Sequence, residues 1–362
     1  MRVIQMLATM AYGDAVGNDA MAIDKALKNA GYSTCIYAEN IGKRIPAGTV
    51  QHVSSVPKMT GEDIILYHLS VGTDLNRKIA DYPGRKIIIY HNITPCEFFI
   101  GYNPTLWQVC KNGREETIFL ADKAEYCLAD SNYNKSELQR FGYKCPIDVL
   151  PILIPFEDYR QTPNKDVIDR YSEDGITNIL FTGRIAPNKC QHDIIAAFYQ
   201  YHKYYNAKSR LILVGNYVGT ERYYEDLRMY AEQLGIEDYV IFPGHIGFDE
   251  ILAYYHLADI FLCMSEHEGF CVPLVEAMYF DIPVIAYDSS AISDTLGGSG
   301  ILLKEKDPLM AAGVIDYIIK NEDIREAIVN RGKERLKDFS HDLIEKQLLS
   351  YLDGFISKGT GK

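Results

Sequence analysis

The residue types best suited to chemistry gather in residues 265–276, a stretch that joins an apolar run at 259–264 to a second apolar segment. Pro273 suits the first position of a helix, because its missing N–H needs no partner there and its φ is already helical. The stretch therefore predicts a strand, an exposed turn and a helix whose first N–H groups can bind a phosphate or carboxylate. The expected donors are the N–H groups of Gly269, Phe270, Cys271 and Val272, and Gly269 lets a ligand approach the backbone closely.

Two carboxylates flank this expected anion site, Glu268 in the turn and Glu276 in the first helical turn. A carboxylate accepts several hydrogen bonds and therefore matches the paired hydroxyls of a ribose or another sugar. Amides for a diphosphate, with carboxylates on both sides for hydroxyls, indicate a nucleotide-sugar site. A simpler explanation competes for Glu276, since the helix dipole alone favours a glutamate there by ~0.3–1 kcal/mol.

A second candidate loop follows the expected strand at 178–183 and precedes an expected helix at 191–205. Gly183 ends the strand, and Arg184 and Lys189 then offer a forked donor and a mobile charge to a diphosphate. The alternative interpretation is that Arg184 and Lys189 are ordinary solvated cations at the surface. Further along, glycines on both sides of His245 close the expected strand at 239–244, where exposed backbone would meet a planar base.

The first half of the chain offers histidines at the ends of two apolar strands. His91 ends the run at 85–92 and His68 ends the run at 63–70, so we expect both at the edge of a sheet. Local backbone contacts are the alternative for either ring. The loop after the first strand contains Gly13 and Gly17 and brings backbone close to a ligand, although its spacing is not the dinucleotide-binding G-x-G-x-x-G.

Length and pattern predict a two-domain α/β protein. The chain has 362 residues, more than one core usually supports, and strands alternate with helices in both halves, as in parallel sheets covered on both faces. A stretch with three prolines at 151–165 suits a hinge. The expected parts are an acceptor-binding domain at 1–155, a nucleotide-sugar domain at 156–338 and a helix in 339–362 that crosses back to the first domain. Further strands are expected at 2–8, 33–39, 125–131, 147–154, 210–215 and 282–287.

Charge and cysteine content exclude several classes of protein. Residues 1–155 contain 16 basic and 16 acidic residues and the remainder 21 and 33, so the acidic excess lies in the second half. The missing basic footprint argues against nucleic acid as a partner. Eight cysteines without a C-x-x-C pair favour a reduced, cytoplasmic setting. The first residues are expected to form a strand, so no signal peptide is expected there, and the printed sequence has no apolar run of about 18 residues. A neutral first half is compatible with peripheral membrane contact.

With these motifs in order, the chain resembles the retaining, Leloir-type glycosyltransferases of the GT-B fold, specifically the GT4 group. The most specific part is Glu268-Gly269-Phe270-x-x-Pro273-x-x-Glu276 combined with the upstream Gly183-Arg184 and Lys189. The resemblance covers nearly the whole chain. It implies two Rossmann-like domains facing across a cleft, with the nucleotide sugar held mainly by the second.

The resemblance also implies roles for the candidate residues. Glu276 would bind the ribose hydroxyls and Glu268 a hydroxyl of the donor sugar. The amides of residues 269–272, with Arg184 and Lys189, would hold the diphosphate, and backbone at His245 would meet the base. The remaining roles fall in the first domain: His91 beside the reacting face of the donor sugar, the loop from Gly13 to Gly17 at the phosphates, and Asp14 and His68 toward the acceptor. Many relatives have two adjacent glycines in that loop, so which residue approaches the phosphate stays open.

For the reaction, the expected catalytic residues are His91, Arg184, Lys189 and Glu268. Departure of a nucleoside diphosphate develops negative charge, which positioned cations and amides stabilise. No cofactor or metal ion is expected, since the chain has no D-x-D, although residues 266–268 could mimic a metal motif. The departing phosphate can itself take the proton of the acceptor, so Glu268 is not cast as a nucleophile.

The expected partners are a nucleoside-diphosphate sugar and a glycan or lipid-linked saccharide acceptor, in the assembly of surface polysaccharide or glycolipid. Two other functions stay open. One is an NDP-sugar 2-epimerase of the same fold, which would need no acceptor, and the other is a catalytically silent nucleotide-sugar-binding subunit. A phosphorylase-like enzyme would need a pyridoxal lysine, and no residue marks one.

Overall fold

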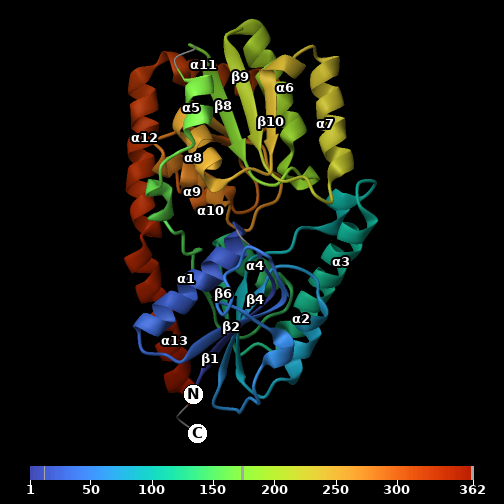
Figure 1. Ribbon diagram of the computed structural model, residues 1–362, viewed down its shortest axis with the longest axis vertical. Helices are drawn as coiled ribbons and strands as arrows, with labels where there is room; N and C mark the ends of the chain where they lie inside the picture. Colours follow the sequence, from blue (N-terminus) through green and yellow to red (C-terminus); the bar gives the residue numbers. More distant parts are fainter. Residues whose placement is uncertain (12, 173–174, 360–362) are drawn as a thin grey trace. The chain divides into compact units, whose positions relative to one another are not determined.

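The computed structural model describes residues 1–11, 13–172 and 175–359, and the chain divides into two compact units (Figure 1). The first unit comprises Met1–Glu97, Thr105–Pro155 and Phe339–Lys362, and the second comprises Phe98–Pro104 and Phe156–Asp338. Each unit is built on one sheet with helices packed on it, which confirms the α/β class predicted from the sequence.

The sheet of the first unit has seven strands in the order β3-β2-β1-β4-β5-β6-β7, paired in parallel. Its strands are β1 (Val3–Met10), β2 (Thr34–Ile41), β3 (Gln51–His52), β4 (Ile64–Leu69), β5 (Arg85–Tyr90), β6 (Tyr126–Ala129) and β7 (Ile147–Val149). The helices are α1 (Ala15–Asn29), α2 (Asp74–Lys78), α3 (Pro104–Phe119) and α4 (Asn132–Arg140), with short 3-10 turns at Val53–Ser55, Ile79–Asp81, Cys96–Phe99 and Leu120–Asp122. Every residue of β4 is buried, as expected for a central strand covered on both faces.

The last helix, α13 (His341–Gly359), belongs to the first unit although second-unit residues precede it in the chain. Arg85 donates to the carbonyl oxygen of Phe355 at 3.1 Å, and the hydroxyl of Tyr32 donates to Asp353 at 2.5 Å. The rings of Tyr126 and Phe355 stack with their centroids 5.9 Å apart. The C-terminal segment therefore returns to the first unit, as the sequence predicted.

The sheet of the second unit has six strands in the order β10-β9-β8-β11-β12-β13, again parallel. Its strands are β8 (Thr177–Thr182), β9 (Ser209–Val214), β10 (Val240–Gly244), β11 (Ile260–Cys263), β12 (Val284–Tyr287) and β13 (Ile301–Leu303). The helices are α5 (Lys165–Tyr171), α6 (Gln191–Tyr204), α7 (Glu221–Gln233), α8 (Phe248–Leu257), α9 (Val272–Tyr279), α10 (Ile292–Leu296), α11 (Pro308–Lys320) and α12 (Glu322–Leu336), with 3-10 turns at Asp158–Arg160, Pro187–Lys189, Glu237–Tyr239 and Lys337–Phe339.

One segment from the first half of the chain packs within the second unit. The side chain of Asn103 donates to the carbonyl oxygen of Gly219 at 2.7 Å, and Arg222 donates to that of Gly101 at 2.6 Å. Tyr102 meets Tyr223 edge to face at 5.4 Å. The sequence-based division of the chain did not include this exchange.

Two sequence-based details were wrong. Gly17 was expected in the loop after the first strand, but α1 starts at Ala15, so Gly17 lies in the first turn of that helix. A Cβ on Gly17 would come within 3.0 Å of Met10 Sδ, so close packing of α1 on β1 explains the glycine. The helix after the 265–271 turn starts one residue earlier than expected, which places Pro273 at its second position.

Candidate functional site

Parallel topology brings the candidate residues of the second unit to one edge of its sheet. Arg184, His245 and the turn at 265–271 follow β8, β10 and β11, and the carboxyl ends of parallel strands meet at the same edge. The backbone just after β9 packs directly against the backbone just after β8. A Cβ on Gly215 would fall 1.8 Å from the carbonyl oxygen of Gly183. Sequence analysis had not singled out Gly215, whose lack of a side chain permits this approach.

The turn before α9 is shaped by a left-handed residue. Cys271 is the N-cap of α9, with φ 72° and ψ 68°, a conformation that costs about 1–2 kcal/mol for a non-glycine residue. The N–H groups of Cys271 and Val272 have no acceptor among the described residues, so they are available to an anion at the positive end of α9. The N–H of Glu268 is used differently, since it donates to Ser290 Oγ at 2.8 Å.

Lys189 and Glu268 form an ion pair at this site. Lys189 Nζ lies 2.5 Å from Glu268 Oε2, with the side chains 21% and 8% exposed. Burial acts to lower the pKa of Lys189, but attraction to the Glu268 carboxylate outweighs it and raises that pKa overall. The ammonium group was expected to contact a diphosphate. In this structure it is oriented by a carboxylate, with further N–H donors left for a ligand.

Arg184 and His245 lie at the surface of the second unit. Arg184 is exposed, and its Nη2 donates to the carbonyl oxygen of Val218 at 2.9 Å. This bond directs the guanidinium toward the loop after β9. His245 is exposed directly after Gly244, whose φ of 78° turns the chain out of β10.

Glu276 lies in α9, where both of its carboxylate oxygens accept hydrogen bonds from tyrosines. The hydroxyl of Tyr159 donates to Oε1 at 2.9 Å and that of Tyr255 to Oε2 at 2.6 Å. Burial raises the pKa of Glu276, and the two tyrosine hydroxyls offset part of this rise. Tyr255 also contacts Thr182 Oγ1 at 2.5 Å. A carboxylate has about four lone-pair sites, so two remain for ribose hydroxyls.

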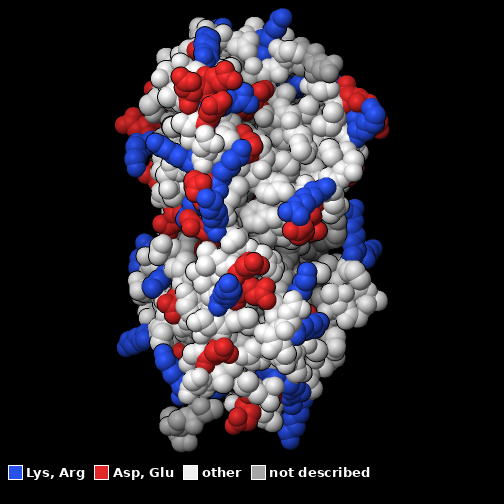
Figure 2. Space-filling view, turned by 90° about the vertical axis from the view of Figure 1, so that its left-hand side faces the viewer, with Lys and Arg blue, Asp and Glu red and all other residues white. Residues whose placement is uncertain are grey.

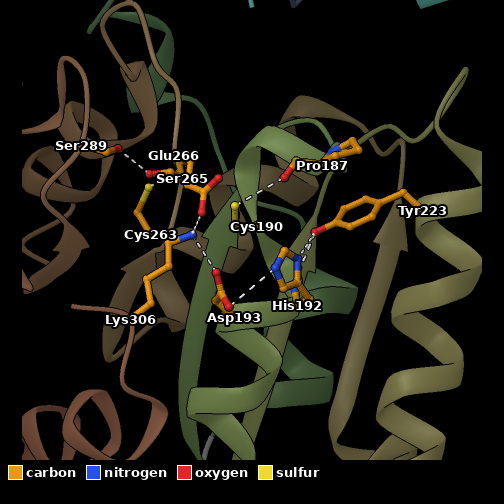
Figure 3. A network of polar contacts seen from close by, with 10 residues as sticks. All are labelled: Pro187, Cys190, His192, Asp193, Tyr223, Cys263, Ser265, Glu266, Ser289 and Lys306. Atoms are coloured by element: carbon orange, nitrogen blue, oxygen red, sulfur yellow. Dashed lines mark hydrogen bonds and ion pairs between the residues drawn. The ribbon is translucent and has the colours of Figure 1, made fainter. Parts of the chain in front are cut away.

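A lysine missed by sequence analysis joins the two loops of the site (Figure 3). Lys306 Nζ contacts Asp193 Oδ2 in α6 at 2.7 Å and Glu266 Oε1 in the turn at 2.8 Å. Its side chain is 16% exposed, and although burial opposes the charge, the two carboxylates raise the pKa of Lys306 overall. The backbone N–H of Glu266 also donates to the carbonyl oxygen of Asn188 at 2.9 Å. The start of α6, the residues just before it and the 265–271 turn are therefore bonded to one another.

In the first unit, the two histidines that sequence analysis singled out are in contact. His68 Nδ1 lies 2.9 Å from His91 Nε2, and His68 Nε2 lies 2.9 Å from Gln5 Oε1. On its other side, His91 Nδ1 lies 2.9 Å from Asp130 Oδ2. Asp130 follows β6, Gln5 lies in β1, and neither was a sequence-based candidate.

The charges around His91 favour its protonated form. Burial alone would lower the pKa of His91, but Asp130, Asp19 and Asp14 raise it overall. Burial also lowers the pKa of His68 well below its usual range, aided by His91, so His68 is neutral. Burial raises the pKa of Asp19 to about 7, with partial compensation by His91.

The loop before α1 caps that helix. The Asp14 carboxylate accepts the N–H of Gly17 at 3.2 Å. Gly13 has φ 74°, with open space where a Cβ would be. Asp14, expected as an acceptor contact, thus has a clear structural role as an N-cap.

Three groups of potential metal ligands occur among the described residues, each with ligand atoms within 4.8 Å of one another: Asp19, His68 and His91; Cys190, His192 and Asp193; and Cys263, Glu268 and Cys271. Residues 266–268 were considered as a possible metal motif. In the structure their two carboxylates pair with different lysines, Glu266 with Lys306 and Glu268 with Lys189.

Surface features bear on partners outside the site. On the face shown in Figure 2, basic side chains are interspersed with acidic ones and form no continuous basic stripe of the kind that binds nucleic acid. Among the described helices, none is both long and apolar enough to cross a membrane.

Comparison with known sequences identifies relatives of the chain. Residues 169–335 match the family described as Glycosyl transferases group 1. The capsular polysaccharide biosynthesis glycosyltransferase CapM of Staphylococcus aureus is 26% identical over 215 residues, covering 58% of this chain and 54% of the relative. A GDP-mannose-dependent alpha-(1-6)-phosphatidylinositol monomannoside mannosyltransferase of Mycobacterium tuberculosis is 23% identical over 261 residues, covering 68% and 66%. The chain thus spans only part of the length of these curated relatives.

Solved structures share the fold over nearly the whole chain. HepE of Anabaena, in complex with UDP and glucose, superposes with a TM-score of 0.78 at 18% identity, covering 98% of this chain and 100% of that one. Sucrose-phosphate synthase of Thermosynechococcus elongatus does so with a TM-score of 0.78 at 15% identity, covering 99% and 100%. The fold is therefore GT-B, as predicted.

Proposed function

We propose, from the match of residues 169–335 to the family of group 1 glycosyl transferases, that the protein is a retaining, metal-independent glycosyltransferase. It moves a hexosyl or deoxyhexosyl unit from a nucleoside-diphosphate sugar to a glycan or lipid-linked acceptor. The observation that carries this proposal is the start of α9, where the N–H groups of Cys271 and Val272 have no acceptor in the described part of the chain and lie in the same turn as Glu268, the partner of Lys189. Anion donors beside a sugar-binding carboxylate fit a sugar diphosphate.

In the proposed complex, the diphosphate binds at the start of α9 and Glu268 accepts a hydroxyl of the donor sugar. Glu276, held by its two tyrosines, accepts the ribose hydroxyls. When the bond between the donor sugar and the diphosphate breaks, negative charge develops on the leaving phosphate. Lys189, Arg184 and the N–H groups stabilise this charge. Such preorganised donors cost no reorganisation at the moment of reaction, and each contributes ~10²–10³-fold.

The first unit supplies the acceptor side in this proposal. His91 is the candidate beside the reacting face of the donor sugar, and Asp130 fixes its ring by the 2.9 Å contact to Nδ1. The proton of the acceptor hydroxyl passes to the departing phosphate on the same face, so no side chain acts as a nucleophile. We propose a cytoplasmic enzyme with peripheral membrane contact, in keeping with the glycolipid and capsule relatives.

Donor binding is the first test. A thermal-shift panel of UDP, GDP, TDP and ADP sugars should show stabilisation by one nucleotide, because a ligand that binds only the folded state adds about 2.7 kcal/mol at 100 times its Kd. The Glu268→Gln variant should lose sugar discrimination while still binding the nucleoside diphosphate. A panel in which no nucleotide sugar raises the melting temperature would remove the proposed donor site.

Transfer is the second test. With the donor identified, candidate acceptors are screened and the anomeric configuration of the product is determined by NMR. Retention supports the proposed stereochemistry, and inversion contradicts it. Consumption of donor to give a rearranged nucleotide sugar without any acceptor would instead identify an epimerase. Activity lost with excess chelator and restored by Mg²⁺ or Mn²⁺ would overturn the metal-free account.

A further inference from the structure

Two buried thiols lie close to each other and to the proposed sugar-binding carboxylate. Cys263 is the last residue of β11 and is 0% exposed, and Cys271, the N-cap of α9, is 8% exposed. Glu268, 7% exposed, lies in the turn between them. The Sγ atoms of both cysteines and one carboxylate oxygen of Glu268 are all within 4.8 Å of one another. This group combines three potential metal ligands at one buried point.

The donor set matches zinc. Zinc binds thiolates at about 2.3 Å and carboxylate oxygens at about 2.0–2.2 Å, so neighbouring ligand atoms in a tetrahedral site lie roughly 3.5–4 Å apart. The ligand atoms here need to approach by about 1 Å or less. Cys263 is fixed in a strand, whereas Glu268 and Cys271 lie in a turn, which is where the adjustment would occur. Soft thiolates select zinc over Mg²⁺ or Ca²⁺.

Lys189 is compatible with such a site. Its Nζ contacts Oε2 of Glu268, and among the described residues no hydrogen bond or ion pair is made to Oε1, so the second oxygen is left for a metal ion. The formal charges of one divalent cation, one ammonium, two thiolates and one carboxylate sum to zero. A buried site with balanced charge avoids the large penalty of an unpaired buried ion.

We propose that Cys263, Glu268 and Cys271 form an inhibitory zinc-binding site. A bound zinc ion takes Glu268 away from the donor sugar and pulls Cys271 toward β11, which displaces the N–H groups at the start of α9. Zinc therefore competes with the nucleotide sugar. The binding half of this inference stands on the geometry alone, whereas the inhibition half rests on the proposed function.

Cd²⁺ serves as the spectroscopic probe, because cadmium–thiolate bonds absorb in the ultraviolet. The starting protein carries Cys127→Ser and Cys145→Ser, since those two thiols, 3.6 Å apart in the first unit, would also bind Cd²⁺. Under a non-thiol reductant, this protein should show a saturable band with one equivalent of Cd²⁺, reversed by Zn²⁺. Adding Cys263→Ser should abolish the saturable band. A band of unchanged size would overturn the site.

A second variant guards against loss of folding in the first. Cys271→Ser removes a thiol from the turn and leaves the strand intact, and its circular dichroism spectrum and melting temperature are compared with those of the starting protein. It should weaken Cd²⁺ binding at least tenfold. Equal affinity in a folded Cys271→Ser protein would contradict the inference.

Inhibition is measured relative to the activity of each protein without metal. Zn²⁺ should inhibit the starting protein, saturating nucleotide sugar should protect it, and Cys263→Ser should need at least tenfold more Zn²⁺. A cadmium band accompanied by full activity would refute the inhibitory role and leave the site itself standing. Absence of transfer without any metal would count against the proposed function, and the spectroscopic result would be unaffected.

Discussion

Asp19→Asn should reduce the loss of stability that the first unit undergoes as the pH rises. Asp19 is buried in α1, and its Oδ1 accepts the N–H of Leu153 at 2.8 Å. Its Oδ2 lies 4.0 Å from His91 Nε2. Asparagine keeps a carbonyl oxygen for Leu153 and carries no charge at any pH. The substitution therefore removes one titration and preserves the hydrogen bond.

The magnitude follows from the pKa of Asp19, which burial raises from 3.8 to about 7. Between these values the folded state binds more protons than the unfolded state, so stability falls as the pH rises. Integrated from pH 5 to pH 8, Asp19 accounts for a loss of about 2–3 kcal/mol. His91 acts in the same direction, because its pKa is also raised in the folded protein. The resulting stability is fully present below the pKa of His91 in the unfolded chain and is lost as the pH rises through its pKa in the folded protein.

The assay is urea unfolding at pH 5 and pH 8, followed by the fluorescence of Trp107, the single tryptophan, which lies in α3. The wild type should lose about 2–3 kcal/mol between the two pH values and Asp19→Asn should lose less than half of that. Asp122→Asn is the control, since that carboxylate is 76% exposed and should leave the slope unchanged. A variant destabilised equally at both pH values would refute the reasoning.

Three further substitutions test the second unit. Lys306→Met leaves Asp193 and Glu266 without their shared cation and should cost ~1–3 kcal/mol of stability and raise the KM for donor. Lys304→Met, which removes an ion pair whose lysine is 76% exposed, is its control, and equal KM values would contradict the role of Lys306. Arg184→Ala should lower kcat/KM ~10²–10³-fold, and an unchanged value in a folded variant would remove Arg184 from the site. Tyr159→Phe removes a hydrogen bond that lowers the pKa of Glu276, so the acidic limb of the kcat/KM profile should move to higher pH; an unmoved limb would show that Glu276 does not control it.

Long apolar runs were enough to predict most of the strands, and the misses have physical causes. β3 and β13 have two and three residues, too few to show a periodic pattern. The strand expected at 147–154 pairs only over Ile147–Val149, because the strand beside it, β6, ends at Ala129 and cannot extend the ladder further. The start of α1 could have been predicted from the sequence, because aspartate is a typical N-cap residue and Asp14 caps this helix.

The candidate site was predictable where each residue could be judged alone. His91, Arg184 and the 265–271 turn were proposed because each follows an apolar run, and the structure places each of them after a strand. The same rule would have found Asp130, which follows β6. Their partners were not predictable, because contacts such as that between Tyr159 and Glu276 join residues 117 positions apart, and no local pattern marks a loop lysine such as Lys306.

The pairing of Lys189 with Glu268 changes how the proposed leaving group is stabilised. A lone lysine beside a diphosphate would attract it strongly in the ground state, and equal binding of ground and transition states does not accelerate chemistry. Here Glu268 offsets the charge and fixes the ammonium in place at 2.5 Å. Its remaining N–H donors gain most when the phosphate oxygen acquires charge during bond cleavage. In the proposed complex the pair therefore favours the transition state over the bound donor. Glu268→Gln, which leaves Lys189 without its counter-charge, should lower kcat while the KM for donor stays the same or falls.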